Sequence, residues 1–305
     1  MRNVMILFFC CAFYLTRAAD PKYPVSAIPE ELKKGMYAVI REQSTTFEIY
    51  DINKSSLTFR SVITILNSKG NKSALMGVGY DKFRTIEYFK GVAYDAAGNV
   101  IKKLKQSEIV DRSSVSGFSL FEDDRIKMAD LSQMTYPYTV EFEFQVQMNF
   151  LYSIPGFWLY TDDEITTQKA VYKVVYPKLY QPRFRTFKIG DPSKKIEADG
   201  REAVTWGFEN VVPVKFEKDG PDVHEIIPHI LAAPDQFEYG GYRGNMSSWE
   251  EYGKWNLLLN KGRDQLPETT KQKVRELTKN LTTTEQKSKA LYEYLQSKTR
   301  YVSIQ

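Results

Sequence analysis

Cysteine is scarce in this 305-residue sequence, which contains only Cys10 and Cys11. Both lie in an N-terminal segment that we expect to be removed on export. The chain that remains would therefore have no disulfide, no thiolate metal ligand and no cysteine nucleophile. An exported protein without disulfides is more typical of a bacterial envelope than of a eukaryotic secretory route.

The sequence also has little net charge. It carries 42 Lys and Arg residues against 38 Asp and Glu residues, and loss of Arg2 and Arg17 with the N-terminal segment leaves 40 against 38. This balance disfavours a surface for nucleic acid or for an anionic membrane. Serine nucleophile elbows, Walker loops and the G-x-G-x-x-G motif are absent as well.

The N-terminus has the pattern of a secretory signal peptide. Arg2 supplies a positive charge, and residues 4–15 form an apolar run that is too short to span a bilayer. Small residues at the end of the segment predict cleavage after Ala18 or Ala19. A lipoprotein signal at Cys10 or Cys11 is the disfavoured alternative, because Phe9 stands where a small residue is needed. We therefore expect a signal peptide over 1–19, no transmembrane helix, and a periplasmic or envelope location.

The clearest structural pattern is an alternation of apolar and polar residues in "YTVEFEFQVQMNF", residues 138–150. Successive side chains of a strand point to opposite faces, so this stretch predicts a long central strand. Phe142 and Phe144 should lie on its buried face, and Glu141 and Glu143 on its solvent-exposed face.

Weaker strand patterns recur between turn signals along the first two-thirds of the chain. They include residues 37–50 and 57–66 and a hairpin with its turn at Gly98-Asn99. Three further segments, "AVYKVVYP", "RFRTFKI" and "EAVTWGFENV", continue the series. Many strands with little helix between them predict a mainly β protein, a large antiparallel β-sandwich over residues 20–238.

Residues 239–305 have a different pattern, which predicts linker segments and short helices. Ser248 and Glu251 form a capping box, and Pro267 suits the first position of a second helix. Thr282 and Glu285 form another capping box before a third helix. The apolar positions expected on the second and third helices are Val274, Leu277, Leu281, Ala290, Leu291, Tyr294 and Leu295.

The two histidines, His224 and His229, lie in "HEIIPH". A zincin places its histidines four residues apart on a helix, whereas here they are five apart and Pro228 interrupts the segment. We therefore favour a structural role for both over metal binding.

Two acidic clusters, residues 122–124 (Glu122, Asp123, Asp124) and 162–164 (Asp162, Asp163, Glu164), are the remaining candidates for chemistry. Neither has the spacing of a calcium loop, and both resemble solvated hairpin ends. Whether they bind calcium stays open at this point. The sequence predicts no catalytic, cofactor-binding or metal site and no cofactor.

Three segments resemble a known protein family, namely "FEDDRIKMADLSQMTYPYTVEFEF", "SSWEEYGKWN" and "ALYEYLQSKTRYVSIQ". Their order is similar to that of a domain of unknown function from bacterial envelope proteins, followed by the first helices of a transglutaminase-like, papain-like core. In that family "RYVSI" precedes a cysteine at a helix start, with histidine and aspartate further on. The resemblance implies that this chain ends before the nucleophile, and that the truncation is natural or reflects an incomplete gene.

Three functions follow from these patterns. The first is a non-catalytic exported β-sandwich module of a transglutaminase-like envelope protein, whose partner is a missing or separate transglutaminase-like domain. The second is a glycan- or peptide-binding protein that uses sandwich-surface aromatics, although packing is the favoured role of these rings. The third, ranked last, is a hydrolase that uses the acidic clusters. The aromatic candidates for the second function are Phe157, Trp158, Tyr160, Phe237, Tyr239 and Tyr242.

Overall fold

The structure is a computed structural model, and it describes residues 21–114 and 123–299. The expected signal peptide over 1–19, the acidic residue Glu122 and the "RYVSI" segment lie outside the described residues. Within them, the chain is mainly β with a short C-terminal helical segment, as the sequence predicted.

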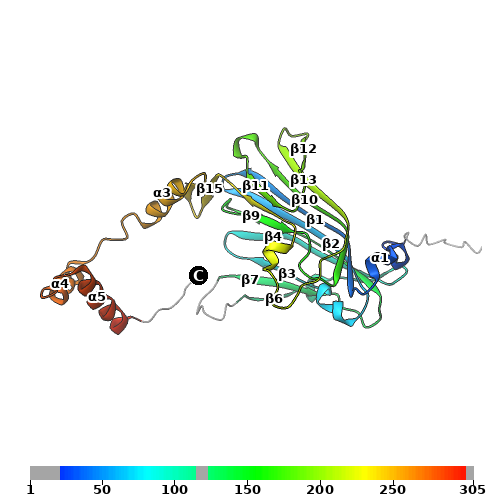
Figure 1. Ribbon diagram of the computed structural model, residues 1–305, viewed down its shortest axis with the longest axis horizontal. Helices are drawn as coiled ribbons and strands as arrows, with labels where there is room; N and C mark the ends of the chain where they lie inside the picture. The colour runs from blue at the N-terminus through cyan, green and yellow to red at the C-terminus, as the bar shows by residue number, and fades with distance from the viewer. Residues whose placement is uncertain (1–20, 115–122, 300–305) are drawn as a thin grey trace, which may run out of the picture.

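An eight-stranded sheet forms the larger layer of the fold (Figure 1). Its strands, in spatial order, are β12 (Ser193–Ile196), β13 (Glu202–Val211), β10 (Ile165–Tyr176), β1 (Ala38–Asp51), β2 (Lys54–Ile65), β8 (Tyr138–Met148), β4 (Arg84–Tyr94) and β5 (Val100–Lys103). One strand pair departs from the predicted antiparallel arrangement, because β1 and β10 run parallel. The chain passes through the intervening strands before it returns as β10, and such a long connection permits either direction.

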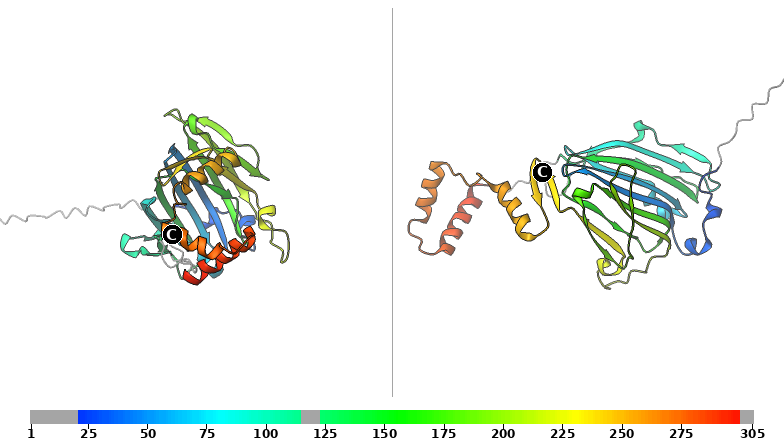
Figure 2. Two further views of the ribbon diagram at one scale, coloured as in Figure 1. Left: turned by 90° about the vertical axis from the view of Figure 1, so that its left-hand side faces the viewer. Right: turned by 90° about the horizontal axis from the view of Figure 1, so that it is seen from above.

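Two three-stranded sheets pack against one face of the large sheet, which makes the fold sandwich-like (Figure 2). Their strands are β11 (Arg183–Phe187), β14 (His229–Ala233) and β9 (Ile154–Trp158) in one, and β3 (Leu75–Tyr80), β7 (Arg125–Asp130) and β6 (Val110–Ser113) in the other. Phe157 of β9 stacks on Tyr172 of β10 with ring centroids 5.4 Å apart, and this contact joins the two layers in one apolar core.

Strand β8 confirms the alternation read from the sequence. It lies between β2 and β4, and Phe142 and Phe144 are buried. The opposite face is half-buried rather than wet, because Glu141 accepts hydrogen bonds from Arg60 (2.9 Å) and from the hydroxyl of Tyr94 (2.6 Å). The strand ends at Met148, two residues before the predicted end.

The hairpin predicted at Gly98-Asn99 joins β4 to β5. Gly98 has φ +92°, a left-handed conformation that glycine adopts without steric cost. A Cβ atom there would also lie 2.4 Å from the carbonyl oxygen of Lys22. The turn therefore needs glycine for two reasons: its backbone is left-handed, and the N-terminal segment passes too close to leave room for a Cβ atom.

The C-terminal part begins with a hairpin and continues as helices. Its elements are β15 (Gln236–Tyr239), β16 (Tyr242–Asn245), α3 (Trp249–Asn260), α4 (Glu268–Thr278) and α5 (Thr284–Lys298). The shorter helical segments of the chain are η1 (Val25–Ala27), α1 (Glu30–Lys33), η2 (Ser68–Ala74), η3 (Gln106–Glu108), η4 (Lys178–Tyr180) and α2 (Val223–Ile226). The expected division at residue 238 falls inside the β15–β16 hairpin. The backbone of Glu238 donates a hydrogen bond to the carbonyl oxygen of Ile52 and accepts one from the amide of Leu151, both in the sandwich.

The helix starts were partly right. Ser248 caps α3 as predicted, accepting a hydrogen bond from the amide of Glu251 at 3.2 Å. Pro267 is the N-cap of α4 rather than its first residue, and Thr283 with Gln286, one residue later than predicted, caps α5.

Helices α4 and α5 pack against each other and extend away from the sandwich (Figure 1). Neither contains a buried residue, and Leu295 of the predicted apolar stripe is 54% exposed. Across the described ranges, no helix has the length and apolar character needed to span a membrane.

Candidate functional site

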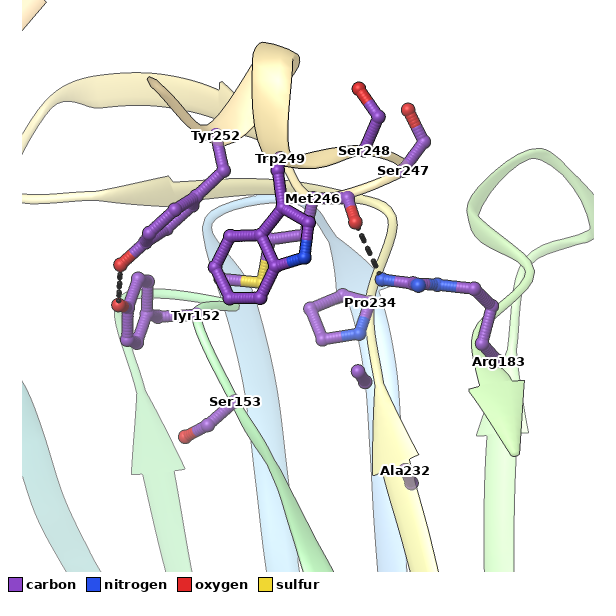
Figure 3. A pocket seen from close by; sticks show the side chains of 11 residues that line it. Tyr152, Ser153, Arg183, Ala232, Pro234, Met246, Ser247, Ser248, Trp249 and Tyr252 are labelled. Carbon is purple, nitrogen blue, oxygen red and sulfur yellow. Dashed lines mark hydrogen bonds between the residues drawn. The ribbon is translucent and has the colours of Figure 1, made fainter. Parts of the chain in front are cut away.

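A mostly apolar pocket lies where α3 meets the three-stranded sheet β11–β14–β9 (Figure 3). Its volume is about 580 Å³. The lining residues are Tyr152, Ser153, Arg183, Ala232, Ala233, Pro234, Met246, Ser247, Ser248, Trp249 and Tyr252. Most of this surface is apolar, with polar groups at the rim, which is the usual composition of a ligand site.

One wall of the pocket is built by aromatic residues that hold α3 to the sandwich. The hydroxyl oxygens of Tyr152 and Tyr252 lie 2.7 Å apart and share a hydrogen bond. Behind them, Trp255 of α3 packs against Phe237 of β15, with ring centroids 5.1 Å apart and the rings nearly perpendicular. The hydrogen bond with Tyr252, together with burial, raises the pKa of Tyr152 to about 12. The Tyr152 hydroxyl therefore stays protonated at physiological pH.

Trp249 stands at the rim of the pocket on the first residue of α3 (Figure 3). Its side chain is 88% exposed, which is unusual for so large an apolar group. Ser248 caps the helix immediately before it, so the start of α3 fixes where the indole projects. A flat, solvent-facing aromatic ring at the edge of a pocket can stack on an apolar ligand face.

Arg183 forms the opposite rim. Its Nη2 donates a hydrogen bond to the carbonyl oxygen of Met246 at 2.7 Å, and its Nε lies 2.5 Å from a carboxylate oxygen of Asp235. These contacts hold the planar guanidinium across from Trp249. The site thus combines an aromatic surface with a fixed set of hydrogen-bonding groups, and it can bind a ligand that has both apolar and hydroxylated faces.

The two histidines are separated by a tryptophan ring. His229 is buried and stacks on Trp158, with centroids 4.2 Å apart and planes 22° apart. His224 meets the same indole edge-on at 4.7 Å. Nδ1 of His229 is 2.8 Å from the carbonyl oxygen of Ile227, and Phe187 covers the other side of its ring. Both histidines therefore pack against Trp158, and this arrangement does not direct their nitrogens to one point.

The acidic clusters make separate contacts. Asp124 pairs with Arg84 at 3.2 Å, and Asp123 lies 3.9 Å from Lys82. In the second cluster, Asp162 accepts a hydrogen bond from the hydroxyl of Tyr37, and Asp163 accepts one from the amide of Phe216. Among the described residues, no group of three His, Cys, Asp or Glu side chains is placed to hold a metal ion.

The aromatic residues singled out in the sequence do not line this pocket. Phe157, Tyr160 and Phe237 are buried, as the packing interpretation predicted. Tyr239 and Tyr242 are partly exposed, and Tyr239 packs against Phe150 of the sandwich. Phe157, Tyr160 and Phe237 are therefore not on the sandwich surface, whereas Tyr239 and Tyr242 are partly accessible there.

Comparison with known sequences identifies the family. Residues 53–215 match DUF3857, a domain of unknown function for which a structure has been solved. The chain belongs to the DUF3857 family. The DUF3857 region runs from the turn before β2 to just past β13, so it includes most of the large sheet but not α3. A search of curated proteins finds no match.

The DUF3857 chain is also similar in fold to a crystal structure, at 2.00 Å resolution, of a protein from Parabacteroides distasonis ATCC 8503 described as a "putative protease". The TM-score is 0.64 with 13% sequence identity, and the similarity covers 88% of this chain and 52% of that one. This chain therefore spans about half the length of that protein, and the likeness concerns the fold alone.

Sequence reasoning on the DUF3857 chain missed the pocket residues Tyr152, Arg183, Trp249 and Tyr252. They come from three separated parts of the sequence, and the folded hairpin β15–β16 brings α3 next to the end of β14 and the segment before β9. The one local signal was Trp249 directly after a helix cap, a position that projects into solvent.

Proposed function

We propose that this chain is the non-catalytic, exported β-sandwich module of a larger transglutaminase-like envelope protein. The observation that carries the proposal is the fold similarity to the P. distasonis protein, which extends over 88% of this chain but only about half of the other. Coverage of most of this chain but only half of the other protein is expected if this chain corresponds to a module that precedes a catalytic domain. The sequence adds that its only cysteines lie at positions 10 and 11, within the expected signal peptide.

The arrangement of the helices supports this role. Helix α3 is fixed to the sandwich by Trp255 and Tyr252, whereas α4 and α5 bury no residue of their own. An amphipathic helix gains most of its stability from burying its apolar face. In a larger protein, the half-buried face that includes Val274 and Leu277 would pack on the transglutaminase-like domain.

The absence of catalysis by the exported chain, residues 20–305, can be tested directly. The purified chain should neither incorporate amines into proteins nor hydrolyse peptides or glutamine amides, because an acyl-enzyme of this class needs a thiolate. Amine incorporation by this chain that iodoacetamide blocks would contradict the proposal.

A second candidate function is glycan binding in the pocket beneath α3. The exposed indole of Trp249 opposite the fixed guanidinium of Arg183 favours it, since sugars present apolar ring faces and hydroxyl groups together. A glycan array would test this candidate, with Trp249→Ala and Arg183→Met as variants and Leu257→Ala, an exposed position on the same helix, as the control. Binding that only the pocket variants lose supports the candidate. Binding to a peptide array instead, or no binding to either, counts against it.

A further inference from the structure

Arg41 of β1 is a buried cation that has no acidic partner among the residues the structure describes. Its side chain is 7% exposed, and no carboxylate of the described residues lies within ion-pair distance of it. Arg60 on the neighbouring strand differs, because it pairs with Glu42 at 2.7 Å and with Glu141 at 2.8 Å. Burying an unpaired guanidinium is costly, so a buried arginine normally has a carboxylate or another anion beside it.

The hydrogen bonds of Arg41 leave one edge of its guanidinium open. Nε donates to the side-chain oxygen of Gln168 at 2.9 Å, and Nη1 donates to the carbonyl oxygens of Tyr23 and Pro24 at 3.1 and 3.4 Å. A guanidinium has five N–H groups, and these contacts use at most three of them. The two donors on Nη2 have no partner among the described residues.

A β-bulge directs Arg41 to this position. The register between β1 and β2 shifts between Ile40 and Glu42, so Arg41 is the extra residue. Consecutive strand residues normally face opposite sides of a sheet, yet Arg41 and Glu42 line the same pocket. The pocket lies on the face of the large sheet that carries Tyr23 of the N-terminal segment, opposite the core face of Phe47.

The pocket measures about 280 Å³ and is polar. Its lining residues are Tyr23, Arg41, Glu42, Gln168, Lys169, Glu209 and Asn210. Glu42 shares Arg60 with Glu141, so Arg60 does not fully neutralise it. The lining therefore has two cations, Arg41 and Lys169, and two carboxylates, Glu42 and Glu209. These carboxylates repel a monoanion less than they repel a phosphate dianion.

We propose that the Arg41 pocket binds an organic carboxylate, which accepts hydrogen bonds from Nη2 of Arg41 and lies within the field of Lys169. A peptide C-terminus and a sugar acid both present this group. Four probes separate these sources, namely the dipeptide Ala-Ala, its C-terminal amide, glucuronate and inorganic phosphate. Each is titrated into the exported chain, residues 20–305, and binding is followed by NMR of the backbone amides.

The expected result is saturable shifts at residues 41–42, 168–169 and 209–210 with Ala-Ala or glucuronate and none with the dipeptide amide. Ala-Ala alone would indicate a peptide terminus, glucuronate alone a sugar acid, and both a general carboxylate site. No saturable shift with either carboxylate, or tighter binding of phosphate, would overturn the proposal.

Variants test the assignment of the residues. Arg41→Met should weaken binding about 10- to 100-fold, the usual effect of losing hydrogen bonds to a charged group. Because Arg41 also holds the N-terminal segment, two exposed positions keep the test independent of folding. Lys169→Gln should weaken binding about two- to fivefold, and Glu209→Gln should strengthen it about as much. Lys90→Gln, an exposed lysine of the same sheet outside the pocket, is the control, and equal affinity in all four variants would also contradict the proposal.

Discussion

Tyr152, just before β9, and Tyr252, on α3, share a hydrogen bond across 100 residues of sequence. Their hydroxyl oxygens are 2.7 Å apart, and the pair forms one wall of the pocket beneath α3. This contact is the polar part of the attachment between the sandwich and the C-terminal helices. The aromatic cluster of Trp255 and Phe237 provides the apolar part.

The Tyr152–Tyr252 bond should make stability depend on pH in the alkaline range. The pKa of Tyr152 is raised from 10.0 to about 12 in the folded chain, so the bond contributes fully below pH 10. Its contribution is lost as the pH rises through about 12. Tyr152→Phe should cost about 0.5–1.5 kcal/mol at pH 8, and the difference from wild type should shrink above pH 10.

Urea unfolding of both proteins at a series of pH values measures this difference. Tyr292→Phe, at a residue that is 61% exposed, serves as the control and should match wild type at pH 8. A gap between Tyr152→Phe and wild type that stays constant up to pH 12 would show that the hydrogen bond is not the cause.

The core face of β8 should be costly to truncate. Phe144 is 9% exposed and stacks on Phe59 of β2 at 5.2 Å, so Phe144→Ala removes a ring from between layers and leaves a cavity. We expect a loss of about 3–5 kcal/mol in the free energy of unfolding. Gln147→Ala, on the opposite face of the same strand, should change it by less than about 1 kcal/mol. Similar losses for the two variants would mean that Phe144 is not in the core.

Gly244 of β16 is expected to tolerate no larger side chain. A Cβ atom there would lie 2.4 Å from Phe237 and 2.7 Å from Trp255, the two rings that hold α3. Gly244→Ala should therefore destabilise the protein by about 1–3 kcal/mol through overpacking. Gly207→Ala in β13 meets no atom within 4 Å and is the matched control. Thermal melts that fail to separate the two variants would argue against close packing at α3.

Helix α5 should be the least protected regular element. It has no buried residue, whereas β8 is bonded on both sides and buried on one face. Local opening of such a helix needs little free energy. Amides of 284–298 should exchange hydrogen much faster than those of 138–148 in a mass-spectrometry time course. Equal protection in a monomer would mean that α4 and α5 form a stable unit of their own.

The parts of the fold that could be predicted depend on local patterns. The alternation around Phe142 identified β8 because side-chain direction in a strand follows the sequence directly. The cap of α5 was misplaced by one residue because Thr282-x-x-Glu285 and Thr283-x-x-Gln286 both have the form of a capping box, so that local sequence does not distinguish them.

The parallel pairing of β1 with β10, the bulge at Arg41 and the pocket under α3 depend on contacts between distant segments. In the pocket, Tyr152 meets Tyr252 only after the hairpin β15–β16 has placed α3 at the end of the sandwich. No periodicity or motif near either residue carries that information. The same holds for Arg41, whose lack of a carboxylate partner within residues 21–114 and 123–299 depends on the arrangement of β1, β2 and β10.

The size of the native polypeptide tests the central claim most directly. Antibodies raised against the sandwich, residues 21–245, can be used to probe the envelope fraction of the source cells by immunoblot. The account predicts a polypeptide well above the 35.3 kDa of this chain, in keeping with the neighbour of which the chain covers 52%. Mass spectrometry of that band should find peptides of the sandwich together with those of a cysteine-containing domain. A single band at or below 35.3 kDa that contains peptides of this chain alone would contradict the account.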